Sequence, residues 1–336
     1  MRVGVVGATG YAGAEVLRLC LTHPEMDVVV ATGESNAGKS VASHVPALAA
    51  LAPRMTYAPT EAVFRELLDV AFVALPHGHS QRIVPDLLAA GVMVVDLGAD
   101  FRLVDPALYE RWYGKPHLQP ELLSRARYGL VERHRASLMG ADLIAVPGCY
   151  PTATSLALGP FIDAGVVHRR GIVVNALSGV SGAGRGTSDR LHFARLASNA
   201  EAYGLLDHRH TSEMQQELGA ELLFTPHLIP VSRGMLVTAY APLVDGASVD
   251  PMALLAEAYA HDPFIVVSPE PPTLKDALGS NLCFVSARVD ERTGWLLAMS
   301  SLDNLIKGAA GQAIQAWNVA TGHDEALGLP RSGVTP

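Results

Sequence analysis

Short apolar runs alternate with longer segments of helical periodicity through the first 150 residues. Runs of this length and continuous hydrophobicity are typical of buried strands, and the segments between them, such as 80–90, have the spacing of helices. Strands that alternate with helices indicate a parallel, doubly wound sheet whose ligand lies at the carboxyl ends of the strands. We therefore predict a Rossmann-type α/β domain over residues 1–148. The predicted strands are 2–6, 27–32, 68–74, 92–96 and 142–146.

The pattern changes after residue 149. Several strand-like runs follow one another with a single helix among them, at 251–260, which suggests an α+β domain over 149–302 with a mainly antiparallel sheet. A helix over 303–320, capped by Asp303, has a smooth face of small residues and is expected to pack back on the first domain. The tail from 328 to 336 is expected to be loose. The predicted strands of this half are 171–177, 222–230, 234–243, 281–289 and 295–301.

Composition narrows the classes of protein that fit this pattern. In 336 residues, 49% are hydrophobic and 17% charged, which is ample for two cores and argues against disorder. The net charge is −8 and no Lys/Arg block occurs, so the electrostatic footprint of a nucleic-acid-binding protein is missing. No apolar run approaches the ~18–20 residues of a membrane span. A strand at the start of the chain leaves no room for a signal peptide, and a cytoplasmic protein is expected.

Three glycines separate the first strand from the first helix. Gly7, Gly10 and Gly13 form a variant of the dinucleotide fingerprint, in which glycines permit a tight turn and let a pyrophosphate rest on the helix N-terminus. Glu34, after the second strand, stands near the place where a carboxylate would bind the ribose 2′-OH of NAD. The nearby Ser35, Asn36 and Lys39 could instead hold a 2′-phosphate, so the residues alone leave the coenzyme open.

Two histidines follow the third predicted strand. His77 and His79 are expected near the cofactor crevice, either in contact with substrate or nicotinamide or as polar residues that cap the next helix. The His-x-His spacing could suggest a metal, but no third ligand is nearby and no Cys or carboxylate cluster supports a site. We predict no metal.

Cys149 lies where a predicted strand gives way to a helix. Unpaired N–H groups and the positive end of the helix dipole favour a thiolate at such a place, and the thiolate is the nucleophile. The alternative is a buried free cysteine that packs as a small hydrophobe. The other two cysteines, Cys20 and Cys283, fall in core-like helical and strand patterns, and three widely spaced cysteines do not make a disulfide framework.

Further candidates lie in the second half of the chain. The glycine-rich segment 178–185 offers backbone N–H groups and Arg185 as a cradle for an anion, unless it is only a flexible turn. A thiol nucleophile needs a base or proton donor within reach, and His208 and His210 are the strongest candidates. In an extended backbone both would share one face, whereas in a helix they would point roughly 200° apart and only one could reach the cleft. In either case we predict that His210, beside the predicted helix start, is the base or proton donor for the thiol.

Together, a dinucleotide site and an activated thiol indicate one chemistry: the thiolate attacks an activated acyl group, and a hydride then reduces the thioester. At this point the chain resembles the N-acetyl-γ-glutamyl-phosphate reductases of arginine biosynthesis, over nearly its whole length. The segment 147–152, Pro-Gly-Cys-Tyr-Pro-Thr, is the most specific part of the match. The other matching segments are 7–13, 37–39, 75–78, 96–103, 178–185, 208–211 and 303–312.

This resemblance implies a function and a set of site residues. It implies a Rossmann domain plus an α+β dehydrogenase domain, with Cys149 as nucleophile, His210 as acid/base and NADPH as coenzyme. It also implies a homo-oligomer, a dimer or tetramer, that acts on a small acyl phosphate. Arg102, Arg185 and His208 are candidate substrate contacts. The two arginines would be clamps for carboxylate or phosphate, unless their roles are structural. The residues expected to bind the cofactor are Gly7, Thr9, Gly10, Tyr11, Ala12, Gly13, Ser35, Lys39, Pro76, Gly179, Gly182 and Asn304.

Two positions depart from the family pattern. Val131 stands where the family usually has proline, a local backbone difference that we expect to be tolerated. Glu34 stands where many members have a polar or basic residue, and a carboxylate there would repel a 2′-phosphate.

The rival functions differ in how they explain the cysteine and the fingerprint. A lysine-pathway relative reduces a carrier-bound aminoadipyl phosphate, but its cysteine motif lacks the Tyr-Pro pair seen at 150–151. In aspartate-semialdehyde dehydrogenase the sequence around the cysteine differs from the one found here. A non-catalytic dinucleotide-binding regulator leaves the Cys–His pair unexplained, and a Cys–His acyl hydrolase needs no dinucleotide.

Overall fold

The computed structural model describes residues 1–334 and divides into two compact units. The first contains residues 1–147 and 309–329, and the second contains residues 148–308 and 330–334.

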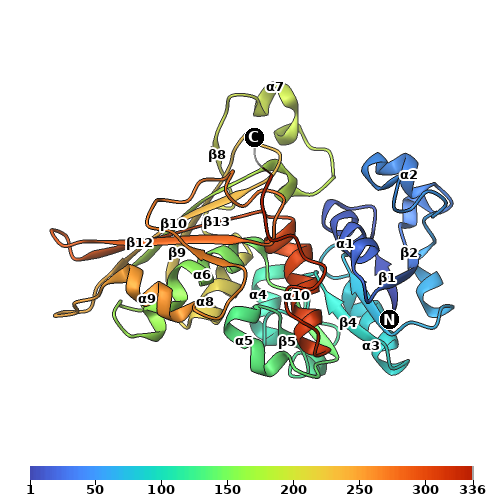
Figure 1. The fold of residues 1–336 in the computed structure, drawn as a ribbon, viewed down its shortest axis with the longest axis horizontal. Helices are drawn as coiled ribbons and strands as arrows, with labels where there is room; N and C mark the ends of the chain where they lie inside the picture. Colours follow the sequence, from blue (N-terminus) through green and yellow to red (C-terminus); the bar gives the residue numbers. More distant parts are fainter. Residues whose placement is uncertain (335–336) are drawn as a thin grey trace. The chain divides into compact units, whose positions relative to one another are not determined.

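The first unit is built on a six-stranded, entirely parallel sheet in the order β2-β1-β3-β4-β6-β5 (Figure 1). Its four inner strands, β1, β3, β4 and β6, are almost completely buried, as expected for a parallel sheet covered on both faces. From β1 the chain passes first to β2 on one side and then to β3 on the other, so the carboxyl ends of β1 and β3 flank a switch point, where such folds bind ligands. The predicted Rossmann-type fold is confirmed. The elements are β1 Arg2–Val6, α1 Tyr11–Thr22, β2 Asp27–Ala31, α2 Val41–His44, β3 Val70–Val73, α3 Ser80–Ala89, β4 Met93–Asp96, α4 Pro106–Tyr113, β5 Arg127–Tyr128, α5 Val131–Leu138, β6 Leu143–Ala145 and α10 Gly311–Ala320.

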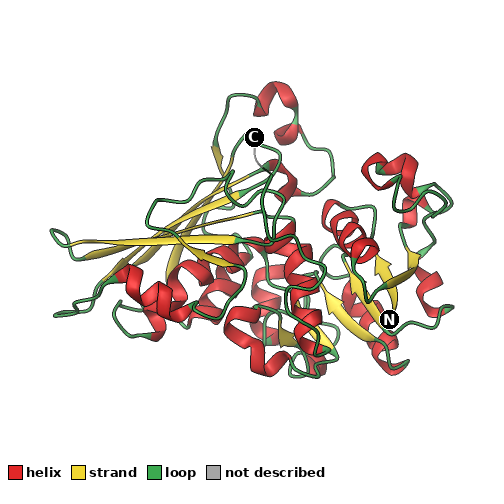
Figure 2. Ribbon diagram, in the orientation of Figure 1, coloured by secondary structure: helices red, strands yellow, loops and turns green. Residues whose placement is uncertain are grey.

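The second unit contains a seven-stranded mixed sheet in the order β11-β12-β13-β10-β7-β9-β8. Only the β11–β12 and β7–β9 pairs are parallel, so the mainly antiparallel sheet predicted here is confirmed. Helices α6, α8 and α9 pack on one face of it (Figure 2). The elements are α6 Cys149–Asp163, β7 Ile172–Ser178, α7 Phe193–Leu196, β8 Glu201–Ala202, α8 His210–Leu218, β9 Leu222–Leu228, β10 Met235–Pro242, α9 Pro251–Ala258, β11 Ile265–Val267, β12 Cys283–Asp290 and β13 Trp295–Leu302.

The opposite face of this sheet is apolar but only partly covered. Alternate residues of β10, such as Val237 and Ala239, are fully buried toward the helices, while Leu236 and Tyr240 between them are half-exposed. Register places their neighbours on the adjacent strands on the same side. The apolar members of this face are Val173, Leu177, Leu223, Leu236, Tyr240, Leu297 and Met299.

The last helix starts later than predicted. Asp303 does act as a cap, because its Oδ1 accepts hydrogen bonds from the N–H groups of Leu305 (2.9 Å) and Ile306 (3.2 Å). The next residues, Ile306–Ala310, form a π-helical turn in which Gly308 N donates to Asp303 O at 3.0 Å. The α-helix α10 begins only at Gly311 and belongs to the first unit.

Residues 330–334, part of the tail that was expected to be loose, belong to the second unit. Asn281 N donates to Pro330 O at 2.9 Å and Val334 N donates to Leu278 O at 2.8 Å, so backbone hydrogen bonds tie this segment to the second unit. Residues 335–336, the rest of that expected tail, lie outside the described residues. Within residues 1–334, no helix is both long enough and apolar enough to cross a membrane.

Candidate functional site

Cys149 is the first residue of α6, directly after the N-cap Gly148, as the strand-to-helix pattern predicted. Its side chain is partly exposed, while Cys20 and Cys283 are buried. Burial raises the pKa of the Cys20 thiol, which keeps that thiol protonated and unreactive. Among the three cysteines, only Cys149 combines access with the positive end of a helix dipole.

Glu213 holds the backbone next to Cys149 in place through a hydrogen bond. Its side chain is 2% exposed, and Oε1 accepts the N–H of Gly148 at 2.8 Å. Glu213 lies three residues after His210 on α8, so the two side chains share a helix face. The sequence analysis overlooked this residue, although its three-residue spacing from His210 was a usable signal.

Two histidines pack against the residue next to the thiol. The ring of Tyr150 lies 5.4 Å from that of His208 and 5.8 Å from that of His210, and the two imidazoles are 4.9 Å apart, centroid to centroid. The backbone at Arg209 is helical. For a helical backbone we expected the two histidines to point apart, so that only one could reach the cleft. Both nevertheless contact Tyr150.

His208 is an uncharged imidazole. Burial is the main cause that lowers its pKa to about 4, with the nearby Arg209 as a further cause. Its Nδ1 accepts the N–H of His210 at 3.2 Å, so the remaining proton is on Nε2. At neutral pH, His208 can therefore donate a hydrogen bond to a ligand but cannot serve as a cationic clamp.

Tyr203 is a second group that sequence analysis overlooked. Its hydroxyl shares a hydrogen bond of 2.8 Å with that of Tyr150, and the Arg190 guanidinium lies 4.4 Å from its ring centroid. Burial raises the pKa of Tyr203 to about 12, and the negative charge of the Cys149 thiolate contributes to the rise. The hydroxyl thus stays protonated within the electrostatic influence of the thiol.

The glycine-rich segment of the second unit is held by Asn304. Asn304 Nδ2 donates to Ser181 Oγ at 3.0 Å, and its Oδ1 accepts Gly234 N at 2.8 Å. A Cβ on Gly182 would lie 3.8 Å from Asn304 Nδ2, and one on Gly179 would lie 2.9 Å from the Arg233 backbone. The structure thus brings Gly179, Gly182 and Asn304 together. Arg185 lies in the exposed part of the same segment.

The π-helical turn packs directly on the nucleophile candidate. A Cβ on Gly308 would lie 2.7 Å from Cys149 Cβ and 3.2 Å from its Cα. Real Cβ atoms do not approach one another so closely, so any side chain at 308 would displace Cys149. π-Helical turns are rare and often occur at functional sites.

In the first unit, the three fingerprint glycines have different neighbours. Gly7 has φ +78°, and a Cβ there would lie 2.5 Å from Ala74 O; a Cβ on Gly13 would lie 2.1 Å from Gly7 O. These two glycines are required by the fold itself. A Cβ on Gly10 would meet only Gly7 O, at 3.7 Å, which leaves open space beside the N-terminus of α1. That space fits the close approach of a dinucleotide pyrophosphate.

The carboxylate of Glu34 is held by Thr60. Glu34 Oε2 accepts Thr60 N at 3.0 Å and Thr60 Oγ1 at 2.8 Å, and these hydrogen bonds lower the pKa of the Glu34 carboxyl. Lys39 Nζ donates to Asn36 Oδ1 at 2.9 Å within the same exposed loop that contains Ser35. Glu34 is therefore bonded to Thr60, and Lys39 is bonded to Asn36.

Arg102, the other candidate clamp, lies in the first unit and is 8% exposed, with Nη2 donating to Leu97 O at 2.8 Å. It follows two buried carboxyls. Asp100 accepts Gly78 N and Ser80 Oγ, whereas Asp96 Oδ1 accepts Gly98 N at 2.9 Å. Burial, followed by repulsion from Asp100, raises the pKa of Asp96 to about 7.

Replacing Asp96 with asparagine is expected to remove a pH dependence of stability. Because the folded-state pKa is raised, the folded protein holds a proton that the unfolded chain releases, so stability falls as the pH rises from about 4 to about 7. The free energy of unfolding of Asp96→Asn, minus that of wild type, should increase by on the order of 2–4 kcal/mol over this window. Urea unfolding at several pH values measures it. A difference that does not change with pH would contradict the assignment.

Two family models match the chain. One, described as "Semialdehyde dehydrogenase, NAD binding domain", matches residues 2–140, and the other, "Semialdehyde dehydrogenase, dimerisation domain", matches residues 149–304. Relatives named N-acetyl-gamma-glutamyl-phosphate reductase match over the full length. The chain is 46% identical to that of Symbiobacterium thermophilum, with 99% of this chain and 98% of the relative covered. It is 42% identical to that of Ectopseudomonas mendocina, with both chains covered completely.

Solved structures agree on the fold. Aspartate semialdehyde dehydrogenase II from Vibrio cholerae, complexed with ASA, aligns with a TM-score of 0.71 at 20% identity, over 95% of this chain and 97% of that one. Aspartate semialdehyde dehydrogenase with NADP from Candida albicans aligns with a TM-score of 0.66 at 18% identity, over 95% of this chain and 97% of that one. At such identities the likeness establishes architecture alone.

Proposed function

Because the chain belongs to the N-acetyl-gamma-glutamyl-phosphate reductase family, we propose that Cys149 is its nucleophile and His210 its acid/base. The reaction is the reduction of N-acetyl-L-glutamyl 5-phosphate to N-acetyl-L-glutamate 5-semialdehyde and phosphate. The observation that carries the assignment of roles is the accessible thiol at the N-terminus of α6, beside the two histidines on Tyr150.

Each step follows from the chemistry of the groups in the second unit. The Cys149 sulfur attacks the acyl carbon, and the bond from that carbon to the phosphate oxygen breaks. Phosphate departs, and the acyl group remains on Cys149 as a thioester. His210 takes the thiol proton before attack. After hydride addition at the thioester carbon, the carbon–sulfur bond breaks, the aldehyde forms and the thiolate is regenerated. The N–H of His208 is available to stabilise negative charge on the acyl oxygen.

The coenzyme is NADP, which supplies the hydride when bound. Gly10 leaves the space for its pyrophosphate, and Thr9, Tyr11 and Ala12 surround the same turn. Ser35 and Lys39 are the proposed contacts of the 2′-phosphate, and the ionised Glu34 carboxylate nearby is held in place by its hydrogen bonds from Thr60. The remaining contacts that we propose come from Pro76, Gly179, Gly182 and Asn304.

Lys39→Ala is expected to weaken NADPH binding and leave NADH binding unchanged. The ammonium group of Lys39 pairs with a 2′-phosphate that NADH lacks, and loss of a charge-assisted contact costs about 1.5–3 kcal/mol, or roughly ten- to hundredfold in Kd. Fluorescence titration with each coenzyme measures the change. Arg111→Ala, an exposed cation on α4 of this unit, is the matched control. Equal weakening for both coenzymes would refute the phosphate contact.

The substrate carries two anionic ends, a carboxylate and a phosphate. Arg102 in the first unit and Arg185 in the second are the proposed clamps. A guanidinium can bind either end through two parallel hydrogen bonds.

The reverse reaction tests the whole proposal. N-acetylglutamate 5-semialdehyde and NADP⁺ are supplied with and without inorganic phosphate, and coenzyme reduction is followed. Phosphate-dependent reduction is expected, since the thioester needs phosphate to release the acyl group. Absence of turnover with this aldehyde, despite coenzyme binding, would refute the substrate and direct attention to a carrier-bound or aspartyl substrate.

The chain also forms a homo-oligomer. Apolar side chains that remain half-exposed on one sheet face, among them Leu236, Tyr240 and Leu297, are better buried against a second copy. The matching family model for this unit is a dimerisation domain. Light scattering gives the mass in solution and tests it. A cytoplasmic location remains a prediction from the sequence.

A further inference from the structure

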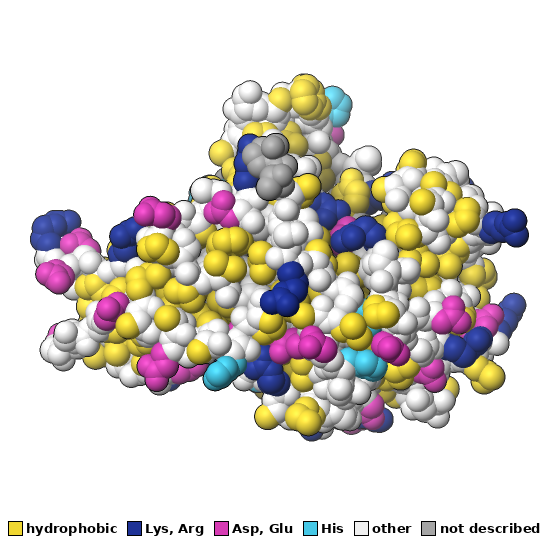
Figure 3. Space-filling view, viewed as in Figure 1, with side chains coloured by type: hydrophobic (Ala, Val, Ile, Leu, Met, Phe, Trp, Pro, Cys, Tyr) yellow, Lys and Arg dark blue, Asp and Glu magenta, His cyan; other side chains and the backbone are white. Residues whose placement is uncertain are grey.

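A buried lysine lies in the π-helical turn that packs on Cys149. Lys307 is fully buried, whereas the other three lysines of the chain, Lys39, Lys115 and Lys275, are exposed. Many lysine and arginine side chains lie at the surface, as Figure 3 shows. Lysines are almost never fully buried, because removing an ammonium group from water is costly. Neither the proposed chemistry nor the proposed coenzyme contacts use this residue.

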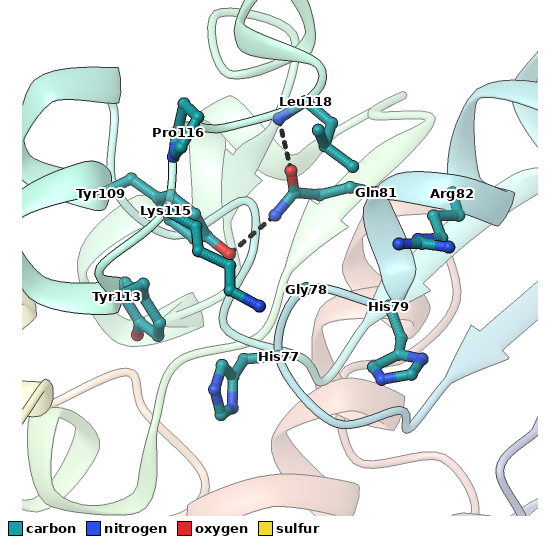
Figure 4. Close-up of a pocket in the computed structure, with 10 residues that line it drawn as sticks. All are labelled: His77, Gly78, His79, Gln81, Arg82, Tyr109, Tyr113, Lys115, Pro116 and Leu118. Carbon is teal, nitrogen blue, oxygen red and sulfur yellow. Dashed lines mark hydrogen bonds between the residues drawn. The ribbon is translucent and has the colours of Figure 1, made fainter.

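Buried polar side chains elsewhere in the chain can be neutral, as Gln81 is in the first unit. Its Nε2 donates to Tyr109 Oη at 2.7 Å and its Oε1 accepts Leu118 N at 2.6 Å (Figure 4). Such bonds join one neutral group to another, and burial then costs little. A buried ammonium group is costly even when it has partners. A buried charge next to a nucleophile is therefore a candidate for a functional role.

The amino group of Lys307 lies against an aromatic ring in the second unit. Its Nζ is 5.6 Å from the centroid of the Phe264 ring, within the ~6 Å of a cation–π contact. Phe264 is itself fully buried, and its carbonyl oxygen accepts Cys283 N at 2.8 Å, so the ring is carried by backbone that is bonded to β12. Cation–π contacts are stronger where water is excluded. The lysine side chain thus anchors the π-helical turn in the core of this unit.

The backbone next to Lys307 is in contact with the nucleophile. A Cβ on Gly308 would lie 2.7 Å from Cys149 Cβ, so the two residues already touch without one. Asp303 holds the same turn from its other end, because its carbonyl oxygen accepts Gly308 N at 3.0 Å and its Oδ1 accepts Leu305 N at 2.9 Å. Since Lys307 is bonded to Gly308, a turn that shifts at Lys307 also shifts the backbone that packs on Cys149.

We infer that Lys307 is a positioning residue for the Cys149 thiol. Its ammonium group fixes the π-helical turn, and the turn fixes the side chain of Cys149 at the N-terminus of α6. Lys307 acts through the backbone of Gly308 and not on the substrate. The inference rests on the proposed role of Cys149 as nucleophile. A reacting group displaced by 1 Å can lose roughly 10²-fold in rate, and a thiol moved away from a helix N-terminus loses stabilisation of its thiolate.

Lys307→Met tests the inference, because methionine keeps an unbranched side chain and removes the charge. One readout is the rate at which iodoacetamide alkylates Cys149 as a function of pH, followed by mass spectrometry. The other is kcat and KM in phosphate-dependent NADP⁺ reduction. We expect the midpoint of the alkylation profile to move to higher pH, and kcat to fall at least about tenfold with the KM for NADP⁺ unchanged. Lys275→Met, at an exposed lysine of the same unit, should leave both readouts as in wild type.

Stability and reactivity should separate in Lys307→Met. Replacing a buried charge by an apolar side chain is often neutral or stabilising, so this variant should unfold in urea at a concentration close to that of wild type, or above it. A lysine with a merely structural role would change the unfolding midpoint and leave the alkylation profile where it is. An unchanged profile in the folded variant therefore overturns the inference, whatever its stability.

Phe264→Leu keeps the test decisive where Lys307→Met does not fold. Leucine retains an apolar side chain and removes the ring that the ammonium group contacts, so the alkylation profile should move in the same direction. The double variant should move it no further than Lys307→Met alone, because the two residues act as one anchor. An unchanged profile in Phe264→Leu, or additive shifts in the double variant, would overturn the inference. Absence of turnover in wild type would instead refute the proposed function, since alkylation is measured without substrate.

Discussion

Cys149→Ala is expected to lower phosphate-dependent NADP⁺ reduction by at least about 10³-fold, the scale of loss when a covalent nucleophile is removed. Coenzyme binding should persist, because the fingerprint lies in the first unit and Cys149 in the second. Steady-state kinetics with the semialdehyde, together with coenzyme titration, measure the two effects. The folded state should be retained, since alanine suits the first turn of α6.

The other two cysteines provide the matched controls. Cys20 and Cys283 are buried, so Cys20→Ala and Cys283→Ala should affect stability but leave kcat close to that of wild type. Iodoacetamide should inactivate wild type and both controls by alkylating Cys149. Substantial turnover by Cys149→Ala would exclude the thioester route.

Gly13→Ala is expected to destabilise the first unit by about 3 kcal/mol or more. The new Cβ would lie 2.1 Å from the carbonyl oxygen of Gly7, a backbone atom that cannot rotate away. Either the turn must open or α1 must move off β1. Thermal unfolding followed by circular dichroism measures the loss.

Gly10→Ala is the matched control within the same turn. Its Cβ would be 3.7 Å from its nearest neighbour, Gly7 O, so the variant should unfold at nearly the same temperature as wild type. Its affinity for NADPH should fall at least about tenfold, because the methyl group would occupy space that the pyrophosphate needs. A Gly10→Ala variant that binds NADPH normally would place the coenzyme elsewhere.

Local hydrophobicity was sufficient to predict the architecture. A strand such as β3, in which all four residues are buried, must be apolar throughout. Its continuous apolar run can therefore be recognised in the sequence without knowing which strands lie beside it. β10 is likewise recognisable as an apolar run, although its alternating burial is not visible in its residue types, because Leu236 and Tyr240 on the less buried side are apolar too. Cys149 was found because a strand, a glycine and a helix are contiguous in the chain.

Features that depend on distant contacts were not predictable in this way. The π-helical turn at Ile306–Ala310 packs on Cys149, about 160 positions away in sequence, and that contact cannot be inferred from local helical periodicity. Likewise, the hydrogen bond of Glu34 to Thr60, 26 residues on, could not be inferred from the residues next to Glu34 in the chain. Tyr203 gave no signal, since its partner Tyr150 is 53 residues away.

The hydrogen bond from Gly148 to Glu213 has a consequence for the balance between the two half-reactions. The thiolate must first attack and later depart, and greater stabilisation of a thiolate makes it a better leaving group but a weaker intrinsic nucleophile. By placing a carboxylate oxygen on the N-cap N–H, Glu213 offsets part of the stabilisation that the α6 dipole gives to Cys149. Glu213 thus acts against the helix dipole, in the direction of a sulfur that attacks more readily and departs less readily.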